Sequence, residues 1–189
     1  MKADFPVILD ACVLANIRVC DLLLRLAETP RLFLPFWSAT ILDETQRTQT
    51  GRLGWPVEIS ESWRSEVTRF FPDACVDKLE CAVSPEEVNE KDRHVVQAAL
   101  RAGAEVIVTF NLRDFPSPAL EPLHIFARHP SEFLLTLFSI EPLLVARRIQ
   151  EIAEAKNERP LDVLKRLRRD VPAFVDHFAT AAGLMLDEA

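Results

Sequence analysis

The stretch KDRHVVQAALRAGAEVIVTFNLRDFP, residues 91–116, carries the clearest structural pattern in the chain. Its first half has apolar residues at helical spacing, and Gly103 stands where a helix of this kind ends. Residues 105–110 then form a β-branched apolar run, which is typical of a strand buried on both faces of a parallel sheet. A polar loop with two prolines follows, from Asn111 to Pro118. The pattern predicts a helix that feeds a central strand, with a loop at the carboxyl end of that strand.

The residues on both sides of this stretch repeat the alternation of strand and helix. Residues 73–90 are acidic and irregular in pattern. The predicted elements are a strand over 5–9, a helix over 11–28 closed by Pro30, a strand over 31–36, a helix from Ser38 towards Gly51, a helix over 60–71 stopped by Pro72, and a last short strand over 123–126. Strands that alternate with helices predict an α/β fold with a mostly parallel central sheet flanked by helices.

The pattern changes at about residue 130, after which only helices are expected. The predicted helices cover 131–139, 141–155, 161–169 and 173–186, with Pro142, Pro160 and Pro172 at their starts. Proline is favoured at the first position of a helix because its missing N–H has no partner there in any case. We therefore divide the chain into an α/β domain, residues 1–129, and a C-terminal all-helical extension, residues 130–189.

Composition limits the class of protein. The 189 residues are 49% hydrophobic, which is enough for one sizeable core, and no apolar run is long enough to cross a membrane. Without a signal-like segment at the N-terminus, a cytoplasmic location is expected. The four cysteines lack metal-site spacing and are interpreted as reduced and mostly buried. The net charge of −7 argues against a broad basic surface for nucleic acids.

Polar and acidic residues follow the predicted strands at one edge of the sheet. Asp10 comes directly after the first strand, and Asn111 and Asp114 follow the strand over 105–110. Asp92 begins the helix that runs back antiparallel to that strand, so it returns to the same edge. In open parallel sheets ligands bind at this carboxyl edge. The sequence therefore predicts that these side chains converge.

Each acid also has an ordinary structural interpretation. Asp10 and Asp92 can cap helices, and Asp114 can be a turn residue. Glu44, in the helix after the second strand, can be a solvated surface charge, and Asp43 beside it competes for the same role. These interpretations do not explain why the acids share one edge. Carboxylates clustered without His or Cys suit a hard cation such as Mg²⁺ or Mn²⁺, which supports phosphodiester hydrolysis.

Three stretches of the chain, in this order, resemble the PIN-domain ribonucleases, and most closely the VapC-type toxins of bacterial toxin–antitoxin pairs. The stretches are VILDACVLAN (7–16), LPFWSATILDETQR (34–47) and EKDRHVVQAALRAGAEVIVTFNLRDFP (90–116). The third is the most specific. The resemblance covers about residues 5–130, and the helical tail is similar to a C-terminal extension found in one subgroup.

The resemblance implies a PIN-like three-layer domain and a metal-dependent endoribonuclease. Its acidic quartet would hold one or two Mg²⁺ or Mn²⁺ ions, and Asn111 would help to orient water on the metal, supported by Thr109. Carried over by position, the four acids are Asp10, Glu44, Asp92 and Asp114. The family pattern favours Glu44 over Asp43. One departure stands out, because relatives commonly carry Asn where this chain has Cys12, and a thiol cannot replace the hydrogen bonds of an amide.

The resemblance also implies partners, namely an RNA substrate, a cognate antitoxin that covers the site and, as is common among relatives, a second copy of the chain. Beside the acids, Arg93, His94 and Arg113 are candidates for contacts with RNA phosphates. The basic cluster KRLRRD, residues 165–170, reads first as a solvated helix face and second as an RNA contact.

Two other classes of function remain open. The first is a non-catalytic RNA- or protein-binding module on a PIN scaffold. The second is another acidic α/β enzyme, such as a phosphatase with Asp10 as nucleophile, which usually has a second acid where this chain has Cys12. A receiver domain fails for a related reason, since no Lys follows the strand over 105–110.

Overall fold

A single parallel sheet organises the chain. The computed structural model describes residues 4–76 and 88–185, so Cys81 and most of the acidic segment lie outside the described residues. Within this part of the chain the sheet has the order β3-β2-β1-β4-β5, and every neighbouring pair is parallel. The strands are β1 (Pro6–Leu9), β2 (Leu34–Ser38), β3 (Cys75–Val76), β4 (Val106–Val108) and β5 (Phe126–Arg128).

Between the strands, and after β5, the described part of the chain is mainly helical. The α-helices are α1 (Ala11–Ala15), α2 (Ile17–Ala27), α3 (Ala39–Arg47), α4 (Val57–Phe70), α5 (Arg93–Ala102), α6 (Ser117–Leu120), α7 (Pro130–Ile140), α8 (Pro142–Ala155), α9 (Pro160–Leu167) and α10 (Pro172–Ala181). Four shorter turns of helix are η1 (Thr48–Arg52), η2 (Glu90–Asp92), η3 (Leu112–Asp114) and η4 (Glu121–Leu123).

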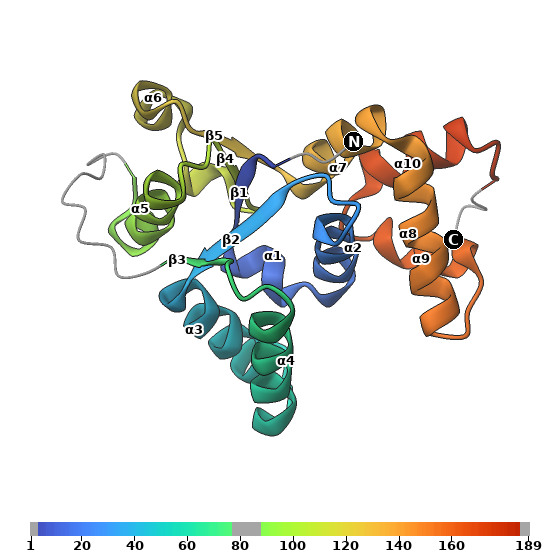
Figure 1. Cartoon of the computed structure of the whole chain (residues 1–189), viewed down its shortest axis with the longest axis horizontal. Helices are drawn as coiled ribbons and strands as arrows, with labels where there is room; N and C mark the ends of the chain where they lie inside the picture. The colour runs from blue at the N-terminus through green and yellow to red at the C-terminus, as the bar shows by residue number, and fades with distance from the viewer. Residues whose placement is uncertain (1–3, 77–87, 186–189) are drawn as a thin grey trace.

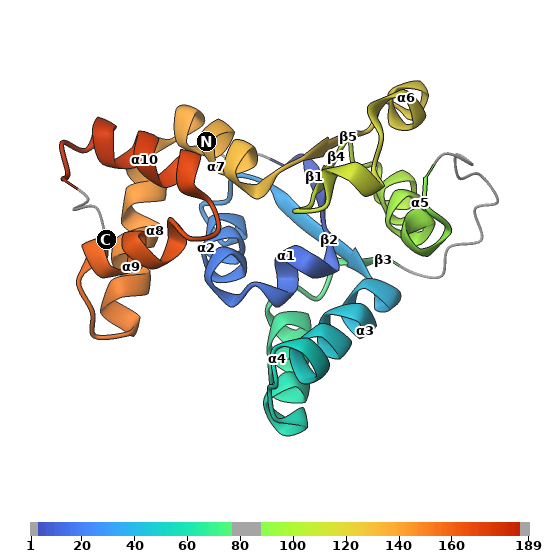
Figure 2. The same ribbon diagram turned by 180° about the vertical axis from the view of Figure 1, so that it is seen from behind.

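The order of the strands puts helices on both faces of the sheet. From β1 the chain first moves outward to β2 and β3, and it then crosses to β4 and β5 on the other side of β1. Because crossovers between parallel strands are right-handed, α5 covers the face opposite to α1 and α2. Figures 1 and 2 show this arrangement, with the C-terminal helices packed outside α2. The predicted α/β class, with a parallel sheet between helices and a helical C-terminal region, is confirmed.

The prediction of one long helix over residues 11–28 is wrong in one respect, because the structure has two helices there, α1 and α2. Asn16 separates α1 from α2 with an extended backbone, and its side-chain oxygen accepts a hydrogen bond from the amide of Val19. An Asn side chain competes for backbone donors and starts a new helix in this way. The break turns α2 away from the direction of α1.

Several strand boundaries also differ from the prediction. The second strand begins three residues later than expected, in the register that sets Ile8 beside Phe36. The last strand is shifted to 126–128. His124, the residue after η4, has a left-handed backbone conformation, so the chain returns to the sheet later than predicted. The short β3, beside β2, falls in a segment predicted to be irregular. Strands of two or three residues depend on their neighbours in the sheet more than on their own sequence.

The helix over 60–71 begins earlier than predicted, at Val57 after Pro56, and the loop after β4 contains η3 and α6. The predicted proline starts of the C-terminal helices are confirmed at the beginning of α8, α9 and α10. None of the described helices combines the length and the apolar composition that a bilayer span requires.

The prediction of mostly buried cysteines is wrong for two of the three described ones. Cys12, Cys20 and Cys75 carry thiols rather than disulfides, but only Cys20 is buried. Cys75 is exposed because it lies on the sheet edge strand β3, and Cys12 is half-buried at the rim of the sheet.

One continuous hydrophobic core joins the sheet to the C-terminal helices. The rings of Phe33, before β2, and Phe133, in α7, lie edge to face with centroids 5.2 Å apart. Aromatic pairs in this geometry contribute beyond the area that they bury. The division into residues 1–129 and 130–189 stays a prediction, but the apolar core crosses that boundary without a break.

Polar contacts hold the C-terminal helices against α2. Arg148 in α8 is only 7% exposed, and its guanidinium donates to the carbonyl oxygens of Thr29 at 3.2 Å and Glu28 at 3.5 Å, just after the end of α2. It also donates to Glu151 at 2.7 Å. Carbonyls at a helix end lack partners within the helix, so they are free to accept from the buried guanidinium of Arg148 and link α8 to the end of α2.

Replacing Arg148 is therefore expected to destabilise the fold. Arg148→Met should lower the free energy of unfolding by about 1–3 kcal/mol, because it removes the hydrogen bonds of a charged group that links α8 to the end of α2. Arg147→Met is the matched control, because Arg147 contacts the same Glu151 but its side chain is 74% exposed. The control should change stability by no more than ~0.5 kcal/mol in urea unfolding. Equal losses in the two variants would contradict this account of the contact.

Candidate active site

The candidate site lies where the strand order reverses, between β1 and β4. These strands pair in parallel, with Leu9 beside Val108, so the chain leaves both strands at the same edge. After β1 the chain turns into α1, and after β4 it enters η3. Ligand sites in open parallel sheets form at such a reversal because the two outgoing connections leave on opposite faces.

Asp10 is held at this edge by hydrogen bonds to both carboxylate oxygens. It caps α1, and its Oδ1 accepts from the amide of Ala11 at 2.7 Å. Its Oδ2 accepts from the Thr109 hydroxyl at 2.6 Å and from the Cys12 thiol at 3.1 Å. The side chain is therefore both a helix cap and part of the rim. Only 7% of Asp10 is exposed, and three donors satisfy the buried charge.

Asp92 and Asp114 face each other across the same edge. The Lys91 ammonium lies 3.5 Å from Oδ2 of each of these acids. Burial raises the pKa of Asp92 above its usual value, and the carboxylates of Asp114 and Asp10 raise it further against the opposing effect of Lys91. Three of the four predicted acids therefore interact electrostatically. Lys91, which the sequence analysis did not single out, neutralises part of their charge.

Glu44 approaches this group through His94. Its Oε2 lies 3.2 Å from Nε2 of His94, while Nδ1 of the same ring lies 2.8 Å from the Lys91 carbonyl oxygen. The neighbouring Asp43 points elsewhere, since it accepts a hydrogen bond at 2.6 Å from Arg64 in α4. The structure thus separates two adjacent acids that helical periodicity could not distinguish.

The remaining predicted residues surround the acids in different ways. Asn111 is exposed. Its backbone N–H donates to the Thr109 hydroxyl at 3.0 Å, and its backbone carbonyl accepts from the backbone N–H of Asp114. Arg113 is exposed in η3. Arg93 donates through Nε to the Val88 carbonyl at 3.1 Å, and so does not simply extend into solvent.

In the C-terminal cluster, Arg166 pairs with Glu158, and Arg168 donates to Asp176 at 2.7 Å. Half of the cations in KRLRRD are thus engaged by acids of the same region. This pairing favours a solvated, ion-paired helix face over an RNA contact.

The donor set suits a hard cation, but it is not drawn together. Oδ2 of Asp92 is buried and makes no close hydrogen bond, and the Lys91 ammonium 3.5 Å away is the cation paired with it. As the side chains stand, no three Asp, Glu, His or Cys groups within residues 4–76 and 88–185 lie close enough together to hold a metal ion. Lys91 is the positive charge between two of the acids. A metal ion would require this ammonium to move and the carboxylates to converge.

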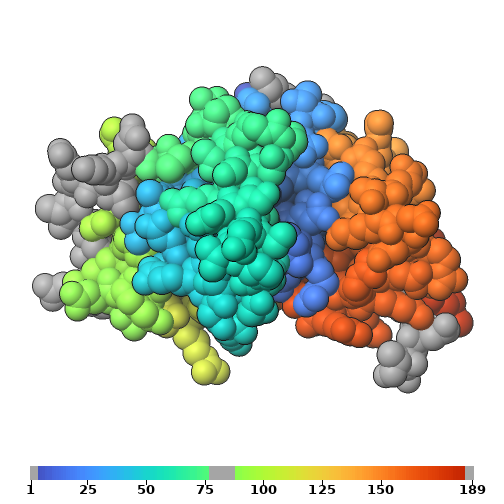
Figure 3. All heavy atoms as spheres, turned by 90° about the horizontal axis from the view of Figure 1, so that it is seen from below, coloured from blue at the N-terminus to red at the C-terminus, as the bar shows by residue number. Residues whose placement is uncertain are grey.

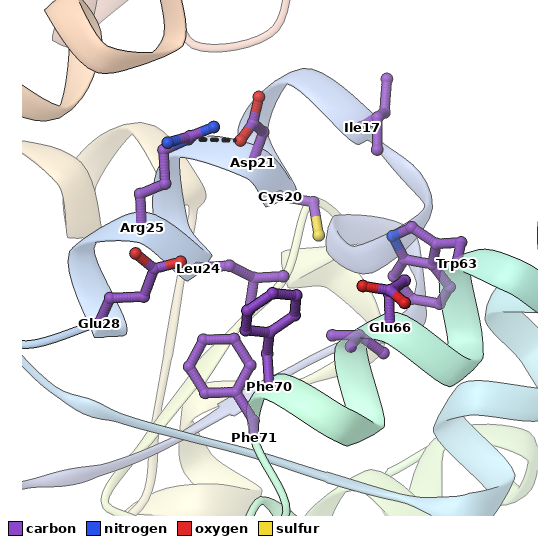
Figure 4. A pocket seen from close by; sticks show the side chains of 11 residues that line it. Ile17, Cys20, Asp21, Leu24, Arg25, Glu28, Trp63, Glu66, Phe70 and Phe71 are labelled. Carbon is purple, nitrogen blue, oxygen red and sulfur yellow. Dashed lines mark hydrogen bonds and ion pairs between the residues drawn. The ribbon is translucent and has the colours of Figure 1, made fainter. Parts of the chain in front are cut away.

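A separate hollow of about 430 Å³ lies between α2 and α4. Its walls are mainly apolar, including Leu24, Trp63 and Phe71, and acids occur on its rim (Figure 4). Asp21 on the rim is bonded to Arg25 at 2.8 Å. The hollow therefore offers apolar contact rather than a converging set of reactive groups.

One comparison with curated proteins bears on the identity of the chain. The chain is similar to "Putative ribonuclease VapC50" of Mycobacterium tuberculosis (strain ATCC 25618 / H37Rv), with 41% identity over 87 residues. The resemblance of the chain to VapC-type PIN ribonucleases is confirmed. The match covers 44% of this chain and 52% of the mycobacterial protein, so the chain spans about half the length of this relative.

Other comparisons add no further relatives. No protein-family profile matches the chain, and no solved structure matches it. The similarity of the helical tail to the extension of one VapC-type subgroup therefore stays a prediction.

The crowded acids should lower the free energy of unfolding of the metal-free protein. Because folding raises the pKa of Asp92, the protein loses stability as the pH rises from the pKa of Asp in the unfolded chain to the higher pKa of Asp92 in the native state. Asp92→Asn should thus increase the free energy of unfolding near pH 7 by more than the ~0.5 kcal/mol typical of surface changes, and by less near pH 4.

Urea unfolding of the metal-free protein at both pH values measures this effect. Asp43→Asn is the control, because Asp43 is paired with Arg64 and its loss should leave stability unchanged or slightly lower. A destabilised Asp92→Asn protein near pH 7 would show that the carboxylate contributes to the fold rather than opposing it.

Proposed function

We propose that this chain is a metal-dependent endoribonuclease, the toxin component of a toxin–antitoxin pair, which hydrolyses RNA phosphodiester bonds with a metal-activated water. The observation that carries the proposal is the electrostatic coupling of Asp10, Asp92 and Asp114 at the β1–β4 edge, where Lys91 lies 3.5 Å from a buried oxygen of Asp92. The similarity to a VapC-type relative supports the same chemistry.

In this proposal Asp10, Glu44, Asp92 and Asp114 hold Mg²⁺ or Mn²⁺. When bound, such an ion neutralises phosphate oxygens and makes water a better nucleophile at neutral pH. Lys91 is exposed and long, so its ammonium can leave the acids without a change in the fold. Once displaced, it becomes available to a phosphate of the RNA.

RNA contact in this protein is proposed to be local. The net charge of −7 excludes a broad basic surface, but Lys91 and the exposed Arg113 flank the acids. Phosphate contacts of this kind position the backbone and carry no base specificity. Asn111, exposed beside the same edge, would help to orient the attacking water.

The activity is tested with purified protein and mixed cellular RNA in the presence of Mg²⁺, Mn²⁺ or EDTA. Cleavage should require the metal, and Asp10→Asn or Asp92→Asn should reduce it by more than the ~10- to 100-fold typical for loss of an outer-shell partner. Asp43→Asn should cleave at the wild-type rate, because its carboxylate is held by Arg64.

The same experiment tests the alternative of a non-catalytic binding module. Intact RNA under every condition, together with no Mn²⁺ binding by calorimetry, would refute the nuclease and favour that module. Full activity in both Asp10→Asn and Asp92→Asn would refute the mechanism even if RNA is cut.

The antitoxin partner is expected to cover the acids, and we propose that it also contacts the hollow between α2 and α4. Exposed apolar residues border it, with Ile17 41% and Phe70 59% exposed. In Figure 3, α2 lies between α4 and the C-terminal helices on this face. Exposed apolar surface beside an apolar hollow is typical of sites that receive side chains of another protein.

A charge placed at this border should weaken the complex. Phe70→Asp is expected to reduce the affinity for the cognate antitoxin at least ~10-fold, since loss of an apolar anchor typically costs more than 1 kcal/mol. Leu143→Asp is the control, because Leu143 in α8 is 83% exposed and lies outside the hollow. Calorimetric titration would detect the difference, and equal affinities in the two variants would exclude this surface. RNA cleavage without antitoxin should be unchanged in both.

A further inference from the structure

Two consecutive amides of the loop after β4 are linked to Asp10 through side chains. The amide of Phe110 donates to the sulfur of Cys12 at 3.3 Å, and the amide of Asn111 donates to the Thr109 hydroxyl at 3.0 Å. The thiol and the hydroxyl in turn donate to the same oxygen, Oδ2 of Asp10, at 3.1 Å and 2.6 Å. The sulfur of Cys12 also lies 3.4 Å from the Thr109 hydroxyl oxygen, so the two chains of hydrogen bonds that end on this carboxylate oxygen are in contact with each other.

This pattern leaves the two oxygens of Asp10 unequal. An ionised carboxylate accepts about four hydrogen bonds, two at each oxygen. Both positions on Oδ2 are taken by Cys12 and Thr109, and the amide of Ala11 takes one on Oδ1 at 2.7 Å. The remaining position lies on Oδ1. Among these contacts, only Oδ1 keeps the capacity for a further ligand.

The Cys12 side chain is the donor in its contact with Asp10. An ionised carboxylate has no hydrogen and can only accept, so the thiol supplies the hydrogen of the 3.1 Å contact. A thiol has a single hydrogen to give.

We propose that Cys12 is a positioning residue for Asp10: together with Thr109 it saturates Oδ2 and leaves Oδ1 to face the cation. The role in cation binding rests on the proposed function, whereas the hydrogen bond itself does not. This assignment explains how the chain keeps Asp10 oriented without the Asn that relatives commonly carry. The thiol supplies one donor to this acid, although it cannot make the further hydrogen bonds of an amide.

The hydrogen bond is tested in the metal-free protein by infrared spectroscopy of the S–H stretch. Difference spectra against Cys12→Ser and Cys20→Ala give the bands of the two thiols separately, and Cys20 is a buried thiol in the hydrophobic core. Donation to a carboxylate should shift the Cys12 band to lower frequency than the Cys20 band. Asp10→Asn should move the Cys12 band back towards higher frequency. Equal frequencies, with no response to Asp10→Asn, would overturn the proposed contact.

The positioning role is tested by Mn²⁺ affinity, measured by calorimetry. Cys12→Ala should weaken binding by about 10- to 100-fold, as is typical when a partner of a metal ligand is lost. Cys12→Ser keeps a donor and should stay within ~3-fold of wild type on the same reasoning. The melting temperature of each metal-free variant serves as the check on folding. If the role of Cys12 is only structural, the melting temperature should change while Cys12→Ser fails to restore the Mn²⁺ affinity that Cys12→Ala loses.

The outcomes separate this inference from the proposed function. If wild type binds Mn²⁺ and cleaves RNA while Cys12→Ala binds equally well, the positioning role is wrong and the nuclease stands. If wild type neither binds Mn²⁺ nor cleaves RNA, the nuclease is wrong and the role of Cys12 in cation binding falls with it. A shifted S–H band in that case would leave Cys12 as a structural partner of Asp10 alone.

Discussion

The parallel pairing of β1 with β4 is the contact on which the rest of the molecule depends. Both strands are apolar and central, and Leu9 and Val108 are fully buried beside each other. Their pairing brings Asp10 next to Thr109, although 98 residues separate them in the sequence. A carboxylate buried to this degree needs donors, and Thr109 after β4 supplies one of them beside Ala11 and Cys12 of α1. The hydrophobic core and the polar rim are therefore assembled by the same strand pair.

The acids at this rim are held near one another at some cost in stability. Burial and mutual repulsion both disfavour the charged form of Asp92, and Lys91 offsets only part of this effect. Sites of this kind are common where function requires like charges to be held together. Asp10 is different, because its hydrogen bonds to Thr109 and Cys12 stabilise the carboxylate that the surrounding apolar core would otherwise exclude.

The C-terminal helices take part in the structure of the first 129 residues as well as extending it. Arg18 in α2 donates to Asp170 at 2.7 Å, and Lys156 lies 3.2 Å from Asp21 on the same helix. Helix α2 is thus held from one side by the C-terminal helices and borders the apolar hollow on the other. The extension fixes one wall of that hollow even though it does not line it.

Local features of the sequence determined much of the fold. The caps at Asp10 and Ser38, the helix end at Gly103 and the proline starts of the last three helices were all predictable, because each depends on hydrogen bonds or backbone geometry within a few residues. The order of strand and helix likewise indicated a parallel sheet, and hence an acidic edge.

Tertiary structure alone decided the contacts between segments that are distant in the sequence. No pattern along the chain indicated that Lys91 would lie between Asp92 and Asp114, and helical periodicity could not tell whether Glu44 or Asp43 would turn towards His94. The edge strand β3 was missed and β5 was placed too early, because strands of two or three residues gain their conformation from the strand beside them. Sequence patterns report interactions between near neighbours, whereas the polarity and packing of a site are set by groups that only the folded chain brings together.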